Sequence, residues 1–275
     1  MTMDKLKIAC VQFTASDDIE SNIIKVEKMV EKSALQGCSL ITTPENTFRM
    51  EKTDSDKKYY NQDDHPAIIA SSNMAKKHNI WLLIGSIAIL SQDGTKYQKN
   101  FNRSLLFSPD GKIAAYYDKI HLFDVEVGDS HSYQESKRIK AGNKMGIVDT
   151  PWGKLGMTIC YDLRFPQLYR QLAKAGARII TVPAAFTQKT GEAHWHTLLR
   201  ARAIENSCFI IAPAQTGTHD DGKQTYGHSL IIDPWGKIIA DGDVDETIIT
   251  AELDLTIVEQ VRKNLPSLTH DRDFS

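Results

Sequence analysis

The chain has 275 residues, of which 41% are hydrophobic and 25% are charged, and its formal net charge at pH 7 is -2. This length is enough to bury a sizeable core, and we expect one domain over residues 1–275. The near-neutral charge argues against nucleic-acid binding and against attachment to a membrane surface through basic residues, so a small molecule is the expected partner.

The sequence also argues against a secreted, membrane-spanning or metal-binding protein. The apolar stretch 80–90 is too short to cross a bilayer, and the N-terminus has no long apolar signal region. The cysteines are widely spaced, without the pairing typical of disulfide scaffolds or zinc sites. They are Cys10, Cys38, Cys160 and Cys208. We therefore expect a cytoplasmic protein with reduced thiols, no metal and no cofactor.

Strand-like and helix-like segments alternate along the first half of the chain, which indicates an α/β fold. Apolar runs predict the strands, and apolar residues spaced three or four apart predict the helices. The expected elements are strand 8–13, helix 18–35, strand 39–43, helix 66–78 and strand 80–90. An apolar strand, a Pro-x-Gly turn and a return strand follow at 105–114, which predicts a hairpin.

The second half repeats this order. The expected elements are strand 155–160, helix 163–175, strand 178–183, helix 194–206 and strand 208–213. A second Pro-x-Gly hairpin follows at 230–239, so both halves close on the same motif. Two such halves predict a sandwich of two sheets with helices on both outer faces.

Two polar segments have no clear place in these halves. The loop 123–144 is long, and a loop of that length inside a compact domain is more often functional than idle. The tail at about 263–275 has little apolar content. We expect this tail either to fray or to pack on another subunit.

Cys160 occupies a position typical of a nucleophile in an α/β enzyme. It follows the apolar run 155–159 and precedes the helix-like stretch 162–175. A thiol at such a turn meets the positive end of the helix macrodipole, which favours the reactive thiolate. The alternative is an inert cysteine that packs as a small apolar residue.

A cysteine nucleophile needs a base, and none of the nine histidines stands out as one. His121 is expected on the same strand face as Lys119. His194 and His196 are two residues apart on a helix and point apart, so we do not expect them to share a metal. His228 is expected to form hydrogen bonds in the core.

Glu45, Lys119 and Cys160 form a more promising set because each follows an apolar strand. Open α/β sheets present their reactive groups at strand ends. Taken singly, Glu45 also fits a helix cap or surface charge, and Lys119 also fits an exposed strand-end cation. Taken together, they supply a nucleophile, a base and an oxyanion-stabilising cation.

Three segments resemble the signature of the nitrilase (carbon-nitrogen hydrolase) superfamily: Pro44-Glu45, Asp118-Lys119-Ile-His-Leu-Phe-Asp and Cys160-Tyr-Asp-Leu-Arg-Phe-Pro. The likeness extends over nearly the whole chain, and includes Ala193-His-Trp, Arg200-Ala-Arg-Ala-Ile-Glu-Asn and Tyr226-Gly-His-Ser. The sequence is most similar to the Nit subfamily of amidases. The resemblance implies an α-β-β-α sandwich that dimerises into an eight-layer assembly.

The resemblance also implies a role for each member of the set. Cys160 attacks an amide carbonyl and forms a thioester. Lys119 and the backbone N–H of Tyr161 stabilise the oxyanion. Glu45 takes the thiol proton, delivers it to ammonia and then activates water. We expect burial to raise the pKa of Glu45 towards neutrality, and the Lys119 cation to lower the pKa of Cys160.

The family carries a second glutamate in the loop between the lysine and the cysteine. Glu135 matches it better than Glu126, and its implied role is to position Lys119 or the substrate amide. Arg164 has two open interpretations. It either binds a substrate carboxylate or forms a salt bridge with Asp162.

The implied substrate is a small carboxylated amide, which the enzyme hydrolyses to the acid and ammonia. Thr187 and Thr190 are candidates to donate hydrogen bonds at the rim of its pocket. We expect deaminated glutathione as the substrate, with α-ketoglutaramate or α-ketosuccinamate as the alternative. The same residues also fit an N-carbamoyl-amide hydrolase, and the same fold could serve as a catalytically silent scaffold. The resemblance implies a homodimer or a higher homo-oligomer.

Overall fold

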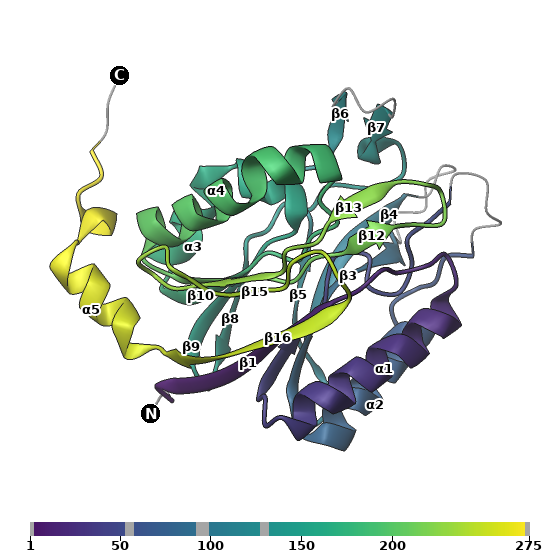
Figure 1. The fold of residues 1–275 in the computed structure, drawn as a ribbon, viewed down its shortest axis with the longest axis horizontal. Helices are drawn as coiled ribbons and strands as arrows, with labels where there is room; N and C mark the ends of the chain where they lie inside the picture. Colours follow the sequence, from purple (N-terminus) through teal and green to yellow (C-terminus); the bar gives the residue numbers. More distant parts are fainter. Residues whose placement is uncertain (1–2, 53–57, 92–98, 127–131, 273–275) are drawn as a thin grey trace.

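The computed structural model describes residues 3–52, 58–91, 99–126 and 132–272. The helices are α1 (Ile19–Leu35), α2 (Pro66–His78), α3 (Pro166–Lys174), α4 (Gln188–Asn206) and α5 (Thr256–Asn264). Two six-stranded sheets lie face to face, with α1 and α2 outside the first sheet and α3 and α4 outside the second (Figure 1). The predicted sandwich of two sheets flanked by helices is therefore confirmed. None of the described helices is long and apolar enough to cross a membrane.

The first sheet has the strand order β16-β1-β2-β3-β4-β5. Its strands are β1 (Lys5–Gln12), β2 (Leu40–Thr42), β3 (Trp81–Leu90), β4 (Asn100–Phe107), β5 (Ile113–Asp118) and β16 (Thr247–Asp254). Strands β1, β2 and β3 are parallel, whereas the β4–β5 hairpin and β16 pair antiparallel. Strand β16 was not expected from the sequence, and it brings the C-terminal part of the chain beside the N-terminal strand.

The second sheet repeats this arrangement in the order β15-β14-β11-β10-β9-β8. Its strands are β8 (Gly146–Thr150), β9 (Gly153–Met157), β10 (Ala177–Thr181), β11 (Phe209–Ala212), β14 (Leu230–Ile232) and β15 (Ile238–Asp241). Three parallel strands are again followed by an antiparallel hairpin. Short strands form two further hairpins: β6 (Asp124–Glu126) with β7 (Ser132–Gln134), and β12 (Thr216–Thr218) with β13 (Gln224–Tyr226). Both halves predicted from the sequence are therefore present.

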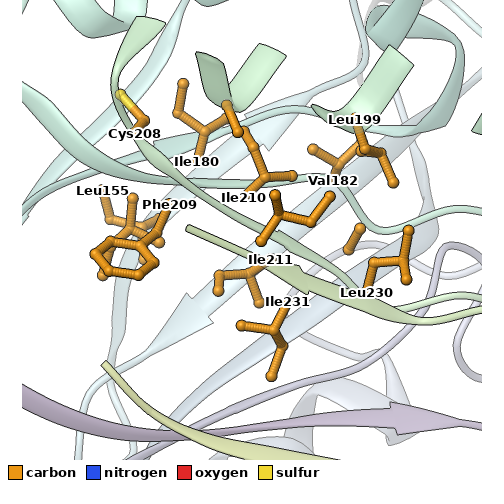
Figure 2. Close-up of a cluster of buried hydrophobic side chains, with 14 of the residues drawn as sticks. Leu155, Ile180, Val182, Leu199, Cys208, Phe209, Ile210, Ile211, Leu230 and Ile231 are labelled. Carbon is orange, nitrogen blue, oxygen red and sulfur yellow. The ribbon is translucent and has the colours of Figure 1, made fainter. Parts of the chain in front are cut away.

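The central strands are buried on both faces, which is why they read as continuous apolar runs. In the second sheet, Ile180 on β10 and Ile210 on β11 are fully enclosed, and Leu199 on α4 packs in the same cluster (Figure 2). A separate cluster fills the space between the first sheet and helices α1 and α2. These clusters hold the strand ends that carry the site in fixed relative positions.

Helix α4 begins at Gln188, six residues before the predicted start at 194. Gly191 lies inside the helix. A Cβ atom at this position would lie 2.3 Å from Cγ of Tyr226. The glycine therefore permits close packing of α4 on β13.

The predicted helix 163–175 is divided in two. A 3₁₀ turn (Cys160–Arg164) comes first, and α3 starts only at Pro166. Phe165 between them has a non-helical conformation, with φ -115° and ψ 86°, because a residue before proline is disfavoured in the helical region.

The two polar segments are partly ordered by local structure. The loop 123–144 contains the β6–β7 hairpin and a 3₁₀ turn (Glu135–Lys137), while its residues 127–131 lie outside the described part. In the tail, Ser267 and Asp271 bind Arg170 of α3. Up to residue 272 the tail therefore packs on its own chain and does not fray. Residues 273–275 lie outside the described part. Contact of the tail with a partner subunit stays a prediction.

Candidate active site

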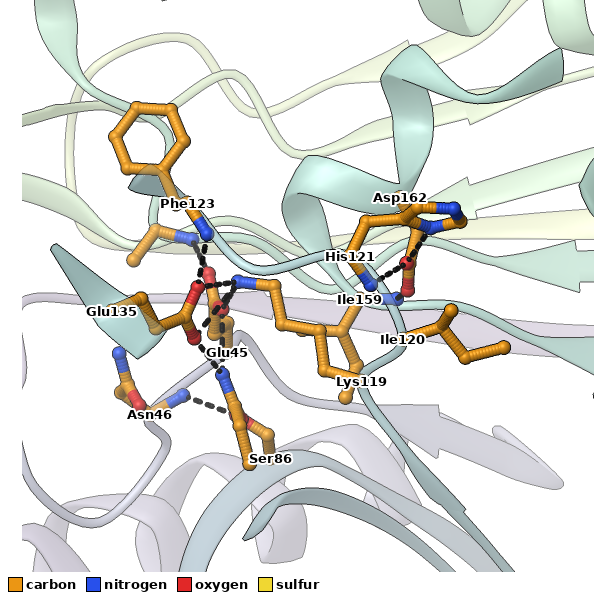
Figure 3. Close-up of polar contacts among 12 residues, drawn as sticks. Glu45, Asn46, Ser86, Lys119, Ile120, His121, Phe123, Glu135, Ile159 and Asp162 are labelled. Atoms are coloured by element: carbon orange, nitrogen blue, oxygen red, sulfur yellow. Dashed lines mark hydrogen bonds and ion pairs between the residues drawn. The ribbon is translucent and has the colours of Figure 1, made fainter. Parts of the chain in front are cut away.

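The structure brings the three predicted strand-end residues together. Glu45 follows β2, Lys119 follows β5 and Cys160 follows β9. Lys119 Nζ lies 2.9 Å from Glu45 Oε1 (Figure 3). Cys160 lines the same cavity as these two residues, and its thiol is close enough to both for their charges to affect its pKa. Glu45 and Lys119 are only 4% and 2% exposed. A base, a cation and a thiol thus meet in a site that largely excludes water.

An irregularity in β3 makes room for Glu45. The register between β3 and β4 shifts between Ile84 and Ile87, where Gly85 lies beneath the turn that follows β2. A Cβ atom at Gly85 would lie 2.2 Å from the carbonyl oxygens of Thr43 and Pro44. Only glycine therefore allows the Glu45 backbone to approach the neighbouring strand so closely.

A second, partly buried carboxylate completes the polar cluster. Lys119 Nζ lies 2.9 Å from Glu135 Oε2, which also accepts a 2.7 Å hydrogen bond from the backbone N–H of Phe123 (Figure 3). Glu126, the competing candidate, lies on β6 and is exposed. The structure therefore places Glu135, and not Glu126, beside Lys119.

The backbone at Cys160 has an unusual conformation. Its φ of +47° lies in the left-handed region, which is unfavourable for a residue other than glycine. The backbone N–H of Cys160 donates a 2.9 Å hydrogen bond to the carbonyl of Pro183 after β10. Because α3 begins only at Pro166, the thiol lies at a 3₁₀ turn and not at the α-helix N-terminus that the sequence suggested.

Asp162 joins the turn at Cys160 to the segment that carries Lys119. Its fully buried carboxylate accepts a 2.8 Å hydrogen bond from Tyr117 Oη. It also binds His121 Nδ1 at 2.7 Å and the backbone N–H of Ile159 at 2.8 Å (Figure 3). Sequence analysis missed this network and considered a pair with Arg164 instead. The position of Tyr117 near the end of β5, two residues before Lys119, was the available signal.

The predicted directions of the pKa shifts are wrong for both Glu45 and Cys160. Burial alone would raise the pKa of Glu45, but the charge and hydrogen bond of Lys119 hold it below its ordinary value. Burial and the Glu45 charge raise the pKa of Cys160 well above its ordinary value, and the opposing effect of Lys119 is smaller. The resting site therefore contains a carboxylate and a neutral thiol.

A cavity of about 260 Å³ opens beside this cluster. Cys160, Tyr161, Thr187 and Thr190 are among the described residues that line it. The hydroxyl groups of Thr187 and Thr190 are 2.8 Å apart and hydrogen bonded to each other. The size suits a small molecule, since it lies near the lower end of the usual range for ligand sites.

Arg164 lies beside the cavity without being one of the described residues that line it. Its guanidinium lies over the rings of Tyr161 and Phe186, 6.0 and 5.5 Å from their centres. Its Nη2 atom is 3.3 Å from Nδ1 of His194. Its neighbours are thus aromatic, and the ring faces attract the cation.

Other cations that the sequence analysis did not identify line the cavity: Arg49, Lys58, Arg138 and Lys223. Arg49 pairs with Asp17 at 2.7 Å, and Arg138 pairs with Glu51 at 2.6 Å. The Lys58 ammonium lies 4.9 Å from the centre of the Tyr60 ring. Carboxylates also line the cavity, among them Glu51 and Asp221, so its wall carries charges of both signs.

A separate polar cluster contains His196, His228 and Asp241. The Asp241 carboxylate binds His196 Nε2 at 3.1 Å and His228 Nδ1 at 2.9 Å, and the ring nitrogens and carboxylate lie within 4.8 Å of one another. His194 takes no part in it. Each carboxylate oxygen already has an imidazole partner, so these contacts are explained by hydrogen bonding alone.

The family follows from comparison with known proteins. A family model described as carbon-nitrogen hydrolase matches residues 7–263. The chain belongs to the carbon-nitrogen hydrolase family. It is a hydrolase of carbon-nitrogen bonds in amides other than peptides, from the Nit branch of the nitrilase superfamily.

Similar proteins extend along nearly the whole chain. It is 39% identical over 275 residues to the deaminated glutathione amidase of Yersinia enterocolitica, covering 99% of this chain and 95% of that protein. It is 39% identical over 280 residues to the deaminated glutathione amidase of Dictyostelium discoideum, covering 98% and 95%. The crystal structure of Saccharomyces cerevisiae Nit3, a member of branch 10 of the superfamily, superposes with a TM-score of 0.86 at 33% identity, covering 99% and 98%.

Proposed function

We propose that this carbon-nitrogen hydrolase converts a small carboxylated amide to its acid and ammonia through a thioester on Cys160. The observation that carries the proposal is the buried pair of Glu45 and Lys119, which lines the same cavity as Cys160. A carboxylate that stays ionised at neutral pH can act as the base that a neutral thiol needs.

In the first step, Glu45 accepts the Cys160 proton while sulfur bonds to the amide carbon. The carbonyl π electrons move to oxygen, and Lys119 and the backbone N–H of Tyr161 stabilise this oxyanion. One such donor contributes about 3–4 kcal/mol in other enzymes. Glu135 and the N–H of Phe123 keep the Lys119 ammonium in place.

In the second step, the oxyanion electrons re-form the carbonyl and the carbon–nitrogen bond breaks. Glu45 gives its proton to the departing nitrogen, which leaves as ammonia, and the thioester remains on Cys160. Glu45 then takes a proton from water as the water oxygen attacks the thioester. Collapse of this intermediate releases the acid, and the Cys160 sulfur recovers its proton from Glu45.

We propose deaminated glutathione as the substrate. The relatives that carry this name are similar to the chain over its whole length. The substrate is anionic, and Arg49, Lys58 and Arg138 supply positive charge along the cavity. Thr187 and Thr190 are proposed to hydrogen bond its polar groups, and Arg164 to attract its carboxylate from beside the cavity.

The test is the release of ammonia from deaminated glutathione and from α-ketoglutaramate, measured in parallel with the Cys160→Ala variant as control. A large preference for deaminated glutathione that the variant abolishes is the expected result. A preference for α-ketoglutaramate would replace the proposed substrate with a shorter ω-amide. No release from either compound, with turnover of carbamoyl amides, would overturn the proposed substrate class.

We also propose that the protein forms a homodimer in the cytoplasm. Trp235 at the β14–β15 turn is 67% exposed, and Ile204 on α4 is exposed beside the same turn. Such an apolar surface is typical of an interface. The free cysteines fit a reducing compartment. Light scattering should give a dimer or higher oligomer that Trp235→Ser weakens, and a monomeric wild-type protein would contradict this.

A further inference from the structure

Asn102 on β4 contacts every charged member of the site. Its Nδ2 atom donates hydrogen bonds to Glu45 Oε1 at 3.0 Å and to Glu135 Oε1 at 3.1 Å. Its backbone carbonyl accepts a 3.0 Å hydrogen bond from the backbone N–H of Lys119. The side chain is 4% exposed and belongs to the cavity wall.

Strand pairing explains this position. Asn102 lies opposite Ala88 on β3, above the irregularity that admits the Glu45 turn. On its other side, Arg103 pairs with Asp118 at the end of β5, which places Asn102 beside Lys119. A single side chain from the strand between β3 and β5 therefore reaches both carboxylates.

The charge balance of the cluster shows what Asn102 contributes. Two carboxylates, Glu45 and Glu135, share the single ammonium of Lys119. Buried carboxylate oxygens need hydrogen-bond donors, and the two N–H groups of an amide supply one to each glutamate without adding charge. An apolar residue here would leave each carboxylate with one donor fewer in a site that largely excludes water.

The other end of the amide supports the same interpretation. Among the described residues, no donor reaches the buried Asn102 Oδ1 atom. The reversed amide would direct that oxygen at two carboxylate oxygens, which is repulsive. The orientation of Asn102 is therefore set by the two glutamates, at the cost of an unsatisfied acceptor.

We propose that Asn102 is a positioning residue that bridges Glu45 and Glu135, holds the general base in place beside Cys160 and favours its ionised form. This inference rests on the proposed role of Glu45 as the base. It predicts an effect on kcat and on the acid limb of the pH profile, with little effect on KM.

The test is the pH dependence of kcat for Asn102→Leu, a substitution of similar size that removes both donors. We expect kcat to fall about 10²-fold, because a positioned acid–base group contributes about 10²–10⁴-fold. We expect the acid limb to shift to higher pH by about one unit, because hydrogen bonds to a carboxylate favour its ionised form and the variant removes one from each glutamate. Asn102→Ser retains one donor, so it should give a smaller shift and remains informative if the leucine variant does not fold.

The matched control is Asn100→Leu. Asn100 lies on the same strand with the same 4% exposure, and its Oδ1 also lacks a donor among the described residues. The control should keep the wild-type acid limb, whatever its effect on KM. An unshifted limb in both Asn102 variants, or an equal shift in the control, would show that Asn102 is merely structural.

The rate of Cys160 alkylation by iodoacetamide, measured against pH, should show the same acid limb as kcat and needs no substrate. It therefore tests Asn102 even if deaminated glutathione is not turned over, which separates failure of this inference from failure of the proposed substrate. A wild-type alkylation rate with no acid limb would overturn both the role of Glu45 as base and the inference about Asn102.

Discussion

Replacing Lys119 by methionine tests the electrostatics of the site most severely. Methionine fills a similar volume but leaves the buried Glu45 and the partly buried Glu135 without their shared cation. Breaking a buried ion pair from one side costs about 3–5 kcal/mol. For a domain of this size class, that corresponds to a fall in melting temperature of roughly 6–20 °C.

The pH dependence of stability should also change sign. In the wild-type protein the pKa of Glu45 lies below its ordinary value, so its contribution is present above about pH 4.3 and is lost as the pH falls through the folded-state pKa. Without Lys119, burial raises the pKa of Glu45 above the ordinary value. The variant should therefore lose stability as the pH rises from about 5 to 8, because the buried carboxyl must then ionise.

The assay is thermal unfolding followed by circular dichroism across that pH range, with amide turnover measured beside it. Lys112→Met is the control, since the Lys112 side chain is 82% exposed and forms a salt bridge with the exposed Asp110. Turnover should fall at least 10²-fold in Lys119→Met, as on removal of an oxyanion donor, and should be unchanged in the control. Equal stability of Lys119→Met and wild type at pH 8 would refute the charge balance described here.

Three further predictions concern single contacts. Tyr117→Phe removes the hydroxyl bound to Asp162 and should lower the free energy of unfolding by about 1–3 kcal/mol in urea denaturation; no loss would mean that this bond is not needed. Gly191→Ala places a methyl group against Tyr226 and should cost about 1–3 kcal/mol through overpacking, which an unchanged melting temperature would contradict. Because burial and the charge of Glu45 raise the pKa of Cys160, its alkylation rate should rise again above about pH 8, beyond the acid limb that Glu45 sets, and a rate that stays level up to about pH 9.5 would argue for a stable thiolate.

The sequence was sufficient to predict which strand-end residues lie together at the candidate site. Glu45, Lys119 and Cys160 each follow an apolar strand, and the chain order of strands and hairpins was enough to predict two stacked sheets. The ends of helices were harder to predict than the strands. The predicted start of α4 was six residues too late, and the packing of Gly191 on Tyr226 inside this helix depends on a contact that is distant in the sequence.

The contacts between strands could not be predicted, because the register of pairing depends on two strands together and cannot be inferred from the sequence of either one alone. Asn102 and Tyr117 reach the site only through the alignment of β3, β4 and β5. The pKa directions failed for a related reason. Burial and the charge of Lys119 act on Glu45 in opposite directions, and only their distance of 2.9 Å decides which effect is larger.

The central claim is that Cys160 carries the acyl group of the amide during turnover. Intact-mass spectrometry of the protein, quenched in acid while it hydrolyses deaminated glutathione, tests this directly. We predict an adduct equal to the substrate mass minus ammonia, located on the Cys160 peptide and missing in the folded Cys160→Ala variant. Hydrolysis that continues at the wild-type rate in Cys160→Ala, without any adduct, would contradict the account.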